Sequence, residues 1–298
     1  AKTKENLAFN GSGEAGHSAT RDKFTDKIDH HGYRSATVPG TVAAWFAAHE
    51  KYGNLPIEQI LAPAIRYAEF GFPASRDFVL RIQGLLKLFP EVTFFADMGI
   101  DTSLSIGDVV IQKDLANTLK LIAQNGRDGF YKGEVADKIV SGTDGWFNHE
   151  DLANHVTRVE APLTAKYRGY SVHGQPPPTQ GMILLEELLL VEDKDLSKLS
   201  EAERIHLMVE AKKIGFMDRN EIIADPEFVP VDTQRILSPE HIAMRRKQIN
   251  PDNAYNGPEG DTKEGSDTTY FIVADAEGNA VSWIQSLFHG FGSAFVPK

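Results

Sequence analysis

The residues with the clearest chemical potential lie near the end of the chain, where Asp267 precedes two threonines, Thr268 and Thr269. A threonine that becomes N-terminal after cleavage of the Asp267–Thr268 bond carries a hydroxyl nucleophile and a free α-amine. The amine can act as the general base, so no histidine is required. The residue pattern alone also leaves a simpler interpretation open, in which Thr268 only begins a β-strand.

The residues that follow Thr268 predict that strand. Residues 268–273 are nearly all good strand formers, residues 277–279 (Glu-Gly-Asn) offer a turn, and residues 280–284 form a second run. The spacing therefore predicts a β-hairpin whose first residue is the candidate nucleophile.

Other chemistries have less support in the sequence. The chain contains no cysteine, which excludes disulfides, thiolate metal sites and cysteine nucleophiles. It also lacks the G-x-S-x-G serine elbow and the G-x-x-x-x-G-K-[ST] phosphate loop. The stretch GSGEAG at residues 11–16 fits the dinucleotide pattern G-x-G-x-x-G, but the residues after it are too polar for the packed helix that this motif needs. Its glycines indicate an irregular loop near a pocket.

Two groups of residues have metal-ligand types. His30 and His31 follow Asp29, and His206 stands four residues before Glu210. Neither group supplies the three protein ligands that a bound zinc ion needs. We therefore expect solvent-exposed or helix-stabilising roles for them, with no metal site and no cofactor.

Composition limits the class of protein. The chain has 298 residues, 41% hydrophobic and 24% charged, which is ordinary for a globular protein. Its formal net charge of −11 argues against nucleic acid as a partner. No apolar run is long enough to cross a membrane, and the first residues do not form a signal peptide. We expect a soluble protein, with the cytoplasm slightly favoured although the compartment stays open.

Helical patterns dominate the chain before the hairpin. Apolar spacing predicts helices that end at Gly53, at Gly71 and at Gly126. The stretch YRGYSVHGQPPPTQG predicts a short strand that leads into a rigid proline turn, and residues 181–192 predict a buried helix that is apolar on most faces.

Ser200 and Glu203 form a capping box that begins another long helix. Only the last thirty residues predict consecutive strands. Helices followed by a hairpin argue against a regular βαβ alternation and predict an α+β chain.

Five segments in order carry a resemblance to a known family. They are SATVPGTVAAWFAAHEKYGNLPIEQILAPAIRYAEFGFPAS, QKDLANTLKLIAQNGRDGFYKGEVADKIV, LTAKYRGYSVHGQPPPTQGMILLEELLLVE, HLMVEAKKIGFMDRNEIIADPEF and TTYFIVADAEGNAVSWIQSLFHGFGS. At this spacing they resemble the γ-glutamyltransferase family of N-terminal-nucleophile hydrolases, over nearly all of the chain.

The resemblance implies a role for each residue at the matching positions. Thr268 corresponds to the catalytic threonine, Thr269 to the second threonine of the pair, and Ser286 to a supporting hydroxyl that hydrogen-bonds the nucleophile. The resemblance also implies that the precursor cleaves itself between Asp267 and Thr268 through an N→O acyl shift. Residues 1–267 would then belong to a large subunit and residues 268–298 would begin a small subunit.

Three positions depart from the family pattern. In γ-glutamyl-specific members, an arginine in an R-E-x-A-P loop holds the substrate α-carboxylate, but the matching loop here contains Gly13 and Glu14, with no arginine before Arg21. A carboxylate at Glu14 would repel an anionic substrate if it faced the pocket. Phe288 stands where an asparagine contacts the substrate, and Tyr270 replaces a histidine. The loops GSGEAG and PPPTQG look more like the acylase and amidohydrolase branch.

For the whole protein, the resemblance implies the αββα sandwich of N-terminal-nucleophile hydrolases. The predicted strands would only begin it, so we expect that the precursor starts before Ala1 and continues beyond Lys298. The expected partners are a small-molecule amide substrate and the other subunit from the same precursor. A homodimer of processed heterodimers is a further option, and neither nucleic acid nor membrane is expected.

The function implied is that of a zymogen that becomes an amidohydrolase or acyltransferase, with glutathione metabolism as the family's setting. One alternative is a hydrolase of a non-glutamyl small amide or acyl side chain, similar to cephalosporin acylases or oxamate-hydrolysing relatives. The other is a non-catalytic member that stays uncleaved and binds a ligand or partner.

Overall fold

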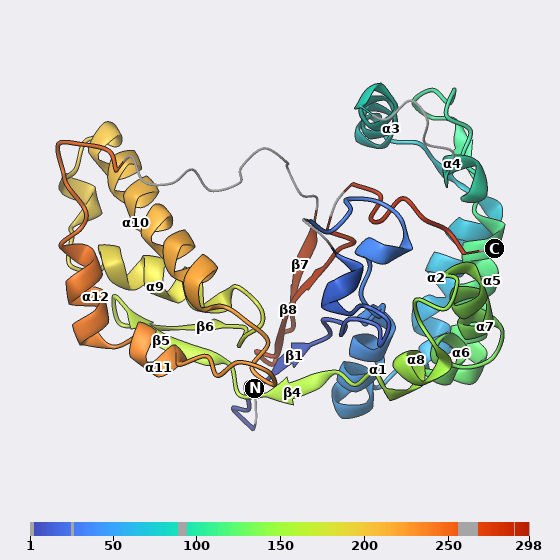
Figure 1. Cartoon of the computed structure of the whole chain (residues 1–298), viewed down its shortest axis with the longest axis horizontal. Helices are drawn as coiled ribbons and strands as arrows, with labels where there is room; N and C mark the ends of the chain where they lie inside the picture. The colour runs from blue at the N-terminus through green and yellow to red at the C-terminus, as the bar shows by residue number, and fades with distance from the viewer. Residues whose placement is uncertain (1–2, 25–26, 89–93, 256–267, 289, 298) are drawn as a thin grey trace. The chain divides into compact units, whose positions relative to one another are not determined.

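The computed structural model describes residues 3–24, 27–88, 94–255, 268–288 and 290–297 (Figure 1). The chain forms two compact units. The first is built from residues 11–157 and 265–298, and the second from residues 2–10 and 158–264. The two units are defined by their compactness alone, so their boundaries do not test the processing site predicted before Thr268.

The first unit is mostly helical. Its elements are two 3-10 turns, η1 (Arg21–Lys23) and η2 (Tyr33–Ser35), the helices α1 (Thr41–Tyr52), α2 (Ile57–Phe70), α3 (Arg76–Leu88), α4 (Phe94–Asp97), α5 (Lys113–Asn125), α6 (Asp128–Tyr131), α7 (Glu134–Gly142) and α8 (His149–Asn154), and the strands β2 (Phe72–Pro73), β3 (Val109–Val110), β7 (Thr269–Ala274) and β8 (Ala280–Gln285). The predicted helix ends at Gly53, Gly71 and Gly126 are confirmed.

Apolar spacing explains the core of the first unit. Helix α5 buries a stripe at helical spacing, formed by Ala116, Leu119, Ile122 and Ala123, and packs against α2. The stripe joins a core that also contains the fully buried ring of Tyr131. Because helices of this length are marginal alone, this shared apolar face supplies most of their stability.

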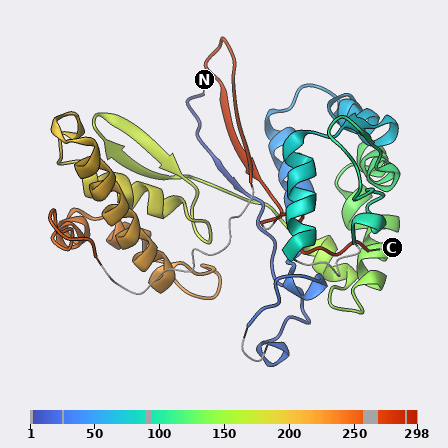
Figure 2. The same cartoon turned by 90° about the horizontal axis from the view of Figure 1, so that it is seen from above.

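The second unit combines hairpins with three main helices. Its elements are the strands β1 (Ala8–Asn10), β4 (Arg158–Glu160), β5 (Leu163–Tyr167) and β6 (Tyr170–Gly174), the 3-10 turn η3 (Leu196–Lys198), and the helices α9 (Gly181–Val191), α10 (Glu201–Ile222), α11 (Thr233–Ile236) and α12 (Pro239–Arg246). Helix α9 packs against β5, β6 and α10 (Figure 2).

Several predictions for this unit are confirmed and one is wrong. Helix α9 is buried as its apolar sequence predicted, and the Ser200–Glu203 capping box begins α10. Consecutive strands are not confined to the end of the chain, because β4, β5 and β6 already follow one another between residues 158 and 174. These strands are short and carry many charged and polar residues, so their alternation is weak.

The described residues contain four two-stranded sheets, β1–β4, β2–β3, β5–β6 and β7–β8, and all four are antiparallel. This arrangement confirms the prediction of a mixed α+β chain without regular βαβ units in the part that the structure describes. Within those residues, no helix is both long and apolar enough to cross a lipid bilayer.

Candidate active site

The predicted hairpin is present and ends at the candidate nucleophile. Strands β7 and β8 pair from Thr269–Gln285 to Ala274–Ala280. Thr268 directly precedes β7 and is exposed, and Ser286 directly follows β8. One further step in the same register places Ser286 opposite Thr268, at the open end of the hairpin. Asp267, on the other side of the predicted scissile bond, lies outside the described residues.

The turn of the hairpin is held by Asp275. Its carboxylate accepts hydrogen bonds from the backbone of Glu277 and Asn279, at 3.0 and 2.9 Å, and from the Asn279 side chain at 2.7 Å. The hydrogen bonds from Asn279, first of all, hold the pKa of Asp275 below its usual value. Gly278 has a φ of +83°, a conformation that favours glycine. The turn therefore fixes the pairing register of β7 and β8, up to the end of the hairpin where Thr268 lies.

The chain after β8 is held by the Ser286 hydroxyl. Its Oγ accepts a hydrogen bond from the Phe288 backbone N–H at 3.1 Å. The hydroxyl proton is then still available to donate, because a serine oxygen accepts through its lone pairs and donates through its own O–H. Ser286 can therefore hold the following turn and hydrogen-bond a neighbouring hydroxyl at the same time.

The loop at residues 11–16 packs closely on the segment before α1. Glu14 accepts a backbone hydrogen bond from the Val38 N–H at 2.9 Å. A Cβ atom on Gly13 would lie 1.7 Å from the Val38 carbonyl oxygen, and one on Gly40 would lie 2.0 Å from the Gly11 carbonyl oxygen. The glycines thus allow two backbone segments to touch.

Glu14 has a partner that the sequence did not reveal. His155 donates from Nδ1 to the Glu14 Oε2 at 2.7 Å, and the His155 side chain is fully buried. The second ring nitrogen of His155 is buried without a hydrogen-bond partner among the described residues. Glu14 therefore holds the glycine-rich loop to the end of α8.

The partners of His206 and Glu210, the second predicted group, are on α10 itself and in the segment of residues 250–255. His206 Nε2 bonds the Asn250 carbonyl at 2.7 Å. Glu210 accepts from Lys213 Nζ at 2.7 Å and from the Tyr255 N–H at 3.0 Å. These contacts agree with helix-stabilising roles for both residues.

The sequence reasoning missed a buried polar cluster in the second unit. Asp218 on α10 accepts from His241 Nε2 at 2.9 Å and from Arg245, whose guanidinium reaches both carboxylate oxygens. Glu186 on α9 is fully buried, and its oxygens receive no N–H or hydroxyl hydrogen bond among the described residues. The available signal was the pair Glu186–Glu187 inside the apolar run of residues 181–191, together with the FMDR motif.

A proton shared between Glu186 and Asp218 explains why the pKa values of their carboxyl groups shift in opposite directions. Burial, together with the hydrogen bond to Asp218, raises the pKa of Glu186 to about 9. Although burial acts in the opposite direction, hydrogen bonds from Glu186, Arg245 and His241 lower the pKa of Asp218. Glu186, Asp218 and His241 are also close enough to hold a metal ion. Arg245 also bonds Asp218 in this cluster.

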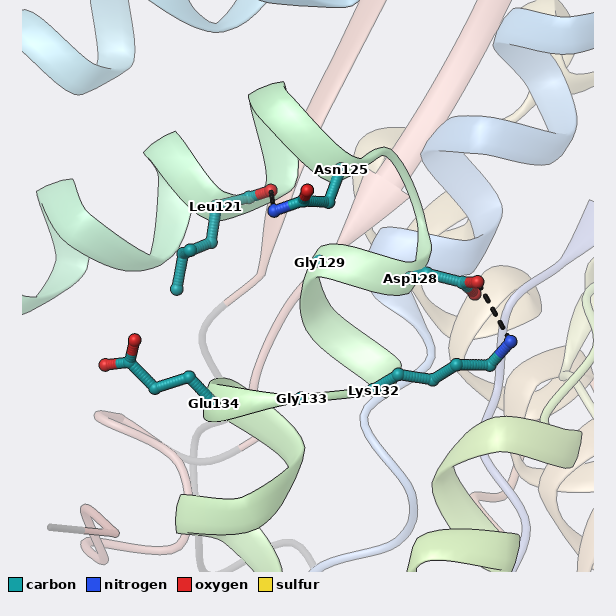
Figure 3. A pocket seen from close by; sticks show the side chains of 7 residues that line it. All are labelled: Leu121, Asn125, Asp128, Gly129, Lys132, Gly133 and Glu134. Atoms are coloured by element: carbon teal, nitrogen blue, oxygen red, sulfur yellow. Dashed lines mark hydrogen bonds and ion pairs between the residues drawn. The ribbon is translucent and has the colours of Figure 1, made fainter.

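A shallow pocket of about 240 Å³ lies where α5, α6 and α7 meet (Figure 3). Its polar side chains are paired with one another or with backbone: Lys132 bonds Asp128 at 2.9 Å and Asn125 bonds the Leu121 carbonyl at 3.2 Å. None of the residues predicted from the sequence lines this pocket, so it adds nothing to the candidate site.

Comparison with known proteins identifies the family. The profile of the gamma-glutamyltranspeptidase family matches residues 1–298. The chain therefore belongs to the gamma-glutamyltranspeptidase family, and the resemblance drawn from the five segments is confirmed.

Relatives and solved structures agree with this assignment. The "Glutathione hydrolase-like YwrD proenzyme" of Bacillus subtilis (strain 168) is 37% identical, over 98% of this chain and 57% of that protein. The "Glutathione hydrolase proenzyme" of Pseudomonas aeruginosa is 36% identical, over 90% of this chain and 49% of that protein. The crystal structure of cephalosporin acylase from Bacillus halodurans superposes with a TM-score of 0.84 at 31% identity, over 97% of this chain and 56% of that chain.

The chain thus spans about half the length of the curated relatives it matches. Relatives with glutathione hydrolase and acylase names both match over most of the chain. Identity therefore does not choose between these activities, and the specificity has to be argued from individual residues.

Proposed function

We propose that this chain contains the catalytic threonine of a self-processing amidohydrolase or acyltransferase. In the precursor, Thr268 Oγ attacks the Asp267 carbonyl carbon, the C–N bond breaks, and an ester forms while the released nitrogen takes up the hydroxyl proton. Water then hydrolyses the ester and leaves an Asp267 carboxylate and a free N-terminal Thr268. Residues 1–267 would belong to the large subunit and residues 268–298 would begin the small one.

The processed Thr268 then acts on a separate amide. Its α-amine removes the hydroxyl proton as Oγ attacks the substrate carbonyl, and the same proton passes to the departing amine. The acyl group, now an ester of Thr268, is transferred to water or to another amine. Thr269 and Ser286 support the nucleophile, and neither a cofactor nor a metal takes part.

The single observation that carries this proposal is the hairpin register. The paired register ends at Thr269–Gln285; we extend it by one residue, which would set Ser286 opposite Thr268, where a hydroxyl can hydrogen-bond the nucleophile. Membership of a family whose relatives are named proenzymes supports the processing step. The exposed hairpin also supports the αββα sandwich, because a two-stranded sheet needs further strands or a packing layer to be stable.

For the acyl group, we propose a small amide or acyl side chain that lacks the γ-glutamyl head group. The loop at residues 11–16 contains no arginine for a substrate carboxylate, and Glu14 is committed to His155. Phe288 offers no side-chain hydrogen bond to a substrate. A glutamyl substrate would therefore lose two of its polar contacts, whereas an apolar acyl group needs neither.

The processing proposal is tested on the full-length precursor by denaturing electrophoresis and intact mass. We expect two fragments, one beginning at Thr268, and an intact, inactive Thr268→Ala variant. Thr268→Ser is the matched control, since it keeps the hydroxyl and should still be cleaved. A wild-type chain that stays whole on incubation contradicts the proposal and favours the non-catalytic alternative.

Specificity is tested on the processed protein with a γ-glutamyl anilide and simple acyl anilides. We expect higher kcat/KM for the acyl compounds. Selective turnover of the glutamyl compound would overturn the specificity proposal while leaving the threonine mechanism intact.

A further inference from the structure

The side-chain amide of Gln285 joins the hairpin to helix α1. Its Oε1 accepts a hydrogen bond from Trp45 Nε1 at 3.0 Å and a second from Trp283 Nε1 at 3.1 Å. An indole nitrogen can only donate, so the amide atom that faces both rings must be the oxygen. Both acceptor positions of that oxygen are therefore used, and the orientation of the amide is fixed chemically.

Gln285 occupies a particular place in the hairpin. It is the last residue of β8, it pairs directly with Thr269, and it precedes Ser286. Because side chains alternate between the two faces of a strand, Gln285, Trp283 and Thr269 share one face. Thr268 and Ser286 belong to the other face. Gln285 therefore anchors the open end of the hairpin from the side opposite the candidate nucleophile.

The element that receives this anchor is itself firmly held. Tyr131 donates to the Pro39 carbonyl at 2.6 Å and accepts from the Ala43 N–H at 3.1 Å, so it fixes the first turn of α1. Helix α1 also buries Val42, Ala43, Ala44 and Phe46. Trp45 thus presents its N–H from a rigid helix, which is the kind of support that precise placement of a reacting group requires.

We propose that Gln285 is a positioning residue for the Thr268 centre. The inference rests on the proposed function and adds to it: Trp45 and Gln285 set where the end of β8 lies, and so set the placement of Ser286 against Thr268. A displacement of about 1 Å at a reacting centre can lower the rate by about 100-fold. Loss of this anchor should therefore slow both self-cleavage and turnover.

The test uses the full-length precursor, four single variants and one double variant. Gln285→Leu removes the acceptor, Trp45→Phe keeps a ring but removes one donor, and Gln285→Glu keeps an oxygen for both indoles. Ser282→Ala, an exposed position on the same hairpin, is the control. The rate at which the fragment beginning at Thr268 forms, and then kcat and KM of the processed protein, are measured.

We expect Gln285→Leu and Trp45→Phe to lower the cleavage rate and kcat by about 10- to 100-fold with little change in KM. Gln285→Glu should recover most of the loss and Ser282→Ala should behave as wild type. The Gln285→Leu, Trp45→Phe double variant should be no slower than the slower single variant, because both changes remove one shared contact.

The outcomes separate the two proposals. If the wild type is processed and Gln285→Leu matches its rates, the positioning role is wrong and the threonine mechanism stands. The positioning role is also wrong if Gln285→Glu recovers nothing and KM rises with the fall in kcat, because that pattern indicates general loosening. An uncleaved, inactive wild type overturns the proposed function, and this inference with it.

Discussion

Phe288, two residues after Ser286, has a left-handed backbone conformation with a φ of +71°. This region is unfavourable for residues with a Cβ atom, and asparagine tolerates it better than most. The Ser286 hydroxyl bonds the Phe288 N–H, so this strained turn directly follows the supporting hydroxyl. The backbone at this position therefore suits the asparagine that γ-glutamyl members carry, although the side chain here is aromatic.

Replacing Phe288 separates the effect of its backbone conformation on stability from the effect of its side chain. Phe288→Asn should raise the free energy of unfolding by up to about 1 kcal/mol, because the left-handed conformation costs about 1–2 kcal/mol for ordinary residues and the exposed ring contributes little burial. Urea unfolding measures the change. Phe288→Leu, which keeps the Cβ penalty, serves as the control, and equal stability of the two variants would refute the backbone argument.

At the residue scale, features set by neighbouring residues could be predicted, whereas contacts between residues far apart in the sequence could not. Thr268, its strand and the turn at Gly278 follow from neighbouring residues, and the structure has the hairpin where the sequence placed it. The partner of Glu14 could not be predicted, because His155 lies 141 positions away. Gln285 was missed for the same reason, since Trp45 lies 240 positions away.

The hydroxyl group of one side chain, Tyr131, holds the start of α1. Tyr131 is fully buried and bonds both Pro39 and Ala43. Burial raises the pKa of Tyr131 to about 12, even though the hydrogen bond from Ala43 acts in the opposite direction. The hydroxyl therefore stays protonated and keeps donating to Pro39 well into the alkaline range.

Tyr131→Phe should lower the free energy of unfolding by about 1–3 kcal/mol, because it leaves the Pro39 carbonyl and the Ala43 N–H without this partner. Tyr33→Phe is the matched control, as Tyr33 makes one exposed hydrogen bond to Asp144 at 3.3 Å; it should change stability by less than about 0.5 kcal/mol. Thermal and urea unfolding compare the two. Equal effects would show that the bonds of Tyr131 do not hold α1.

Helices α9, α10 and α12 meet at the cluster of Glu186, Asp218, His241 and Arg245. Glu186 comes from α9, Asp218 from α10, and His241 and Arg245 from α12. His241 faces both carboxyl groups, at 2.9 Å from Asp218 and 3.5 Å from Glu186. His241 and Arg245 of α12 therefore bond Asp218 of α10 beside Glu186 of α9, so the cluster joins three elements that are separated in sequence.

This proton predicts a pH dependence of stability. The pKa of Glu186 rises from its ordinary 4.5 to about 9 on folding, so the folded chain binds one more proton between these values. The free energy of unfolding should therefore fall from about pH 5 to pH 9, by at most about 1.4 kcal/mol per pH unit. Glu186→Gln should remove this slope, because an amide donates to Asp218 at every pH.

The control for this measurement is Glu201→Gln, an exposed glutamate in the first turn of α10, which should keep the slope of the wild type. Because the pKa of Asp218 is lowered, this residue affects stability only in acid. There the free energy of unfolding falls as the pH falls through the pKa of Asp218. A wild-type slope that matches Glu186→Gln would show that Glu186 is ionised. Loss of stability on adding EDTA would instead indicate that a metal holds the cluster.

At the scale of elements, capping and periodicity were sufficient for most helices but not for this cluster. The Ser200–Glu203 box and the apolar stripe of α5 are local patterns: α10 begins and α5 ends where predicted. The contacts of Glu186 depend on how three helices pack, which no local pattern encodes. Strand β6 lies in the stretch that predicted a short strand, whereas β4 and β5 were missed because strand pairing, rather than a strong residue preference, defines them.

On the scale of the whole molecule, the hairpin that carries Thr268 is largely uncovered. Residues of β7 and β8 are exposed along almost their whole length, including Tyr270 at 56%, Ile272 at 64% and Ile284 at 63%. Large apolar side chains gathered on one element mark a surface that another layer covers. In the proposed αββα sandwich, further strands and a second sheet would bury them, which would also exclude water from the face that Thr268 and Ser286 share.

Ile272→Lys tests this burial in two forms of the protein. In the 298-residue chain it should lower binding of a hydrophobic dye, because the side chain is exposed there. In the full-length precursor it should reduce the yield of folded, processed protein, because a charge in an apolar interior is strongly unfavourable. Ile205→Lys is the matched control: Ile205 lies on α10 and is 56% exposed, so its substitution should leave processing unchanged. A full-length Ile272→Lys precursor that accumulates and cleaves like wild type would mean that this face stays open in the complete protein, and the sandwich proposed for it would be wrong.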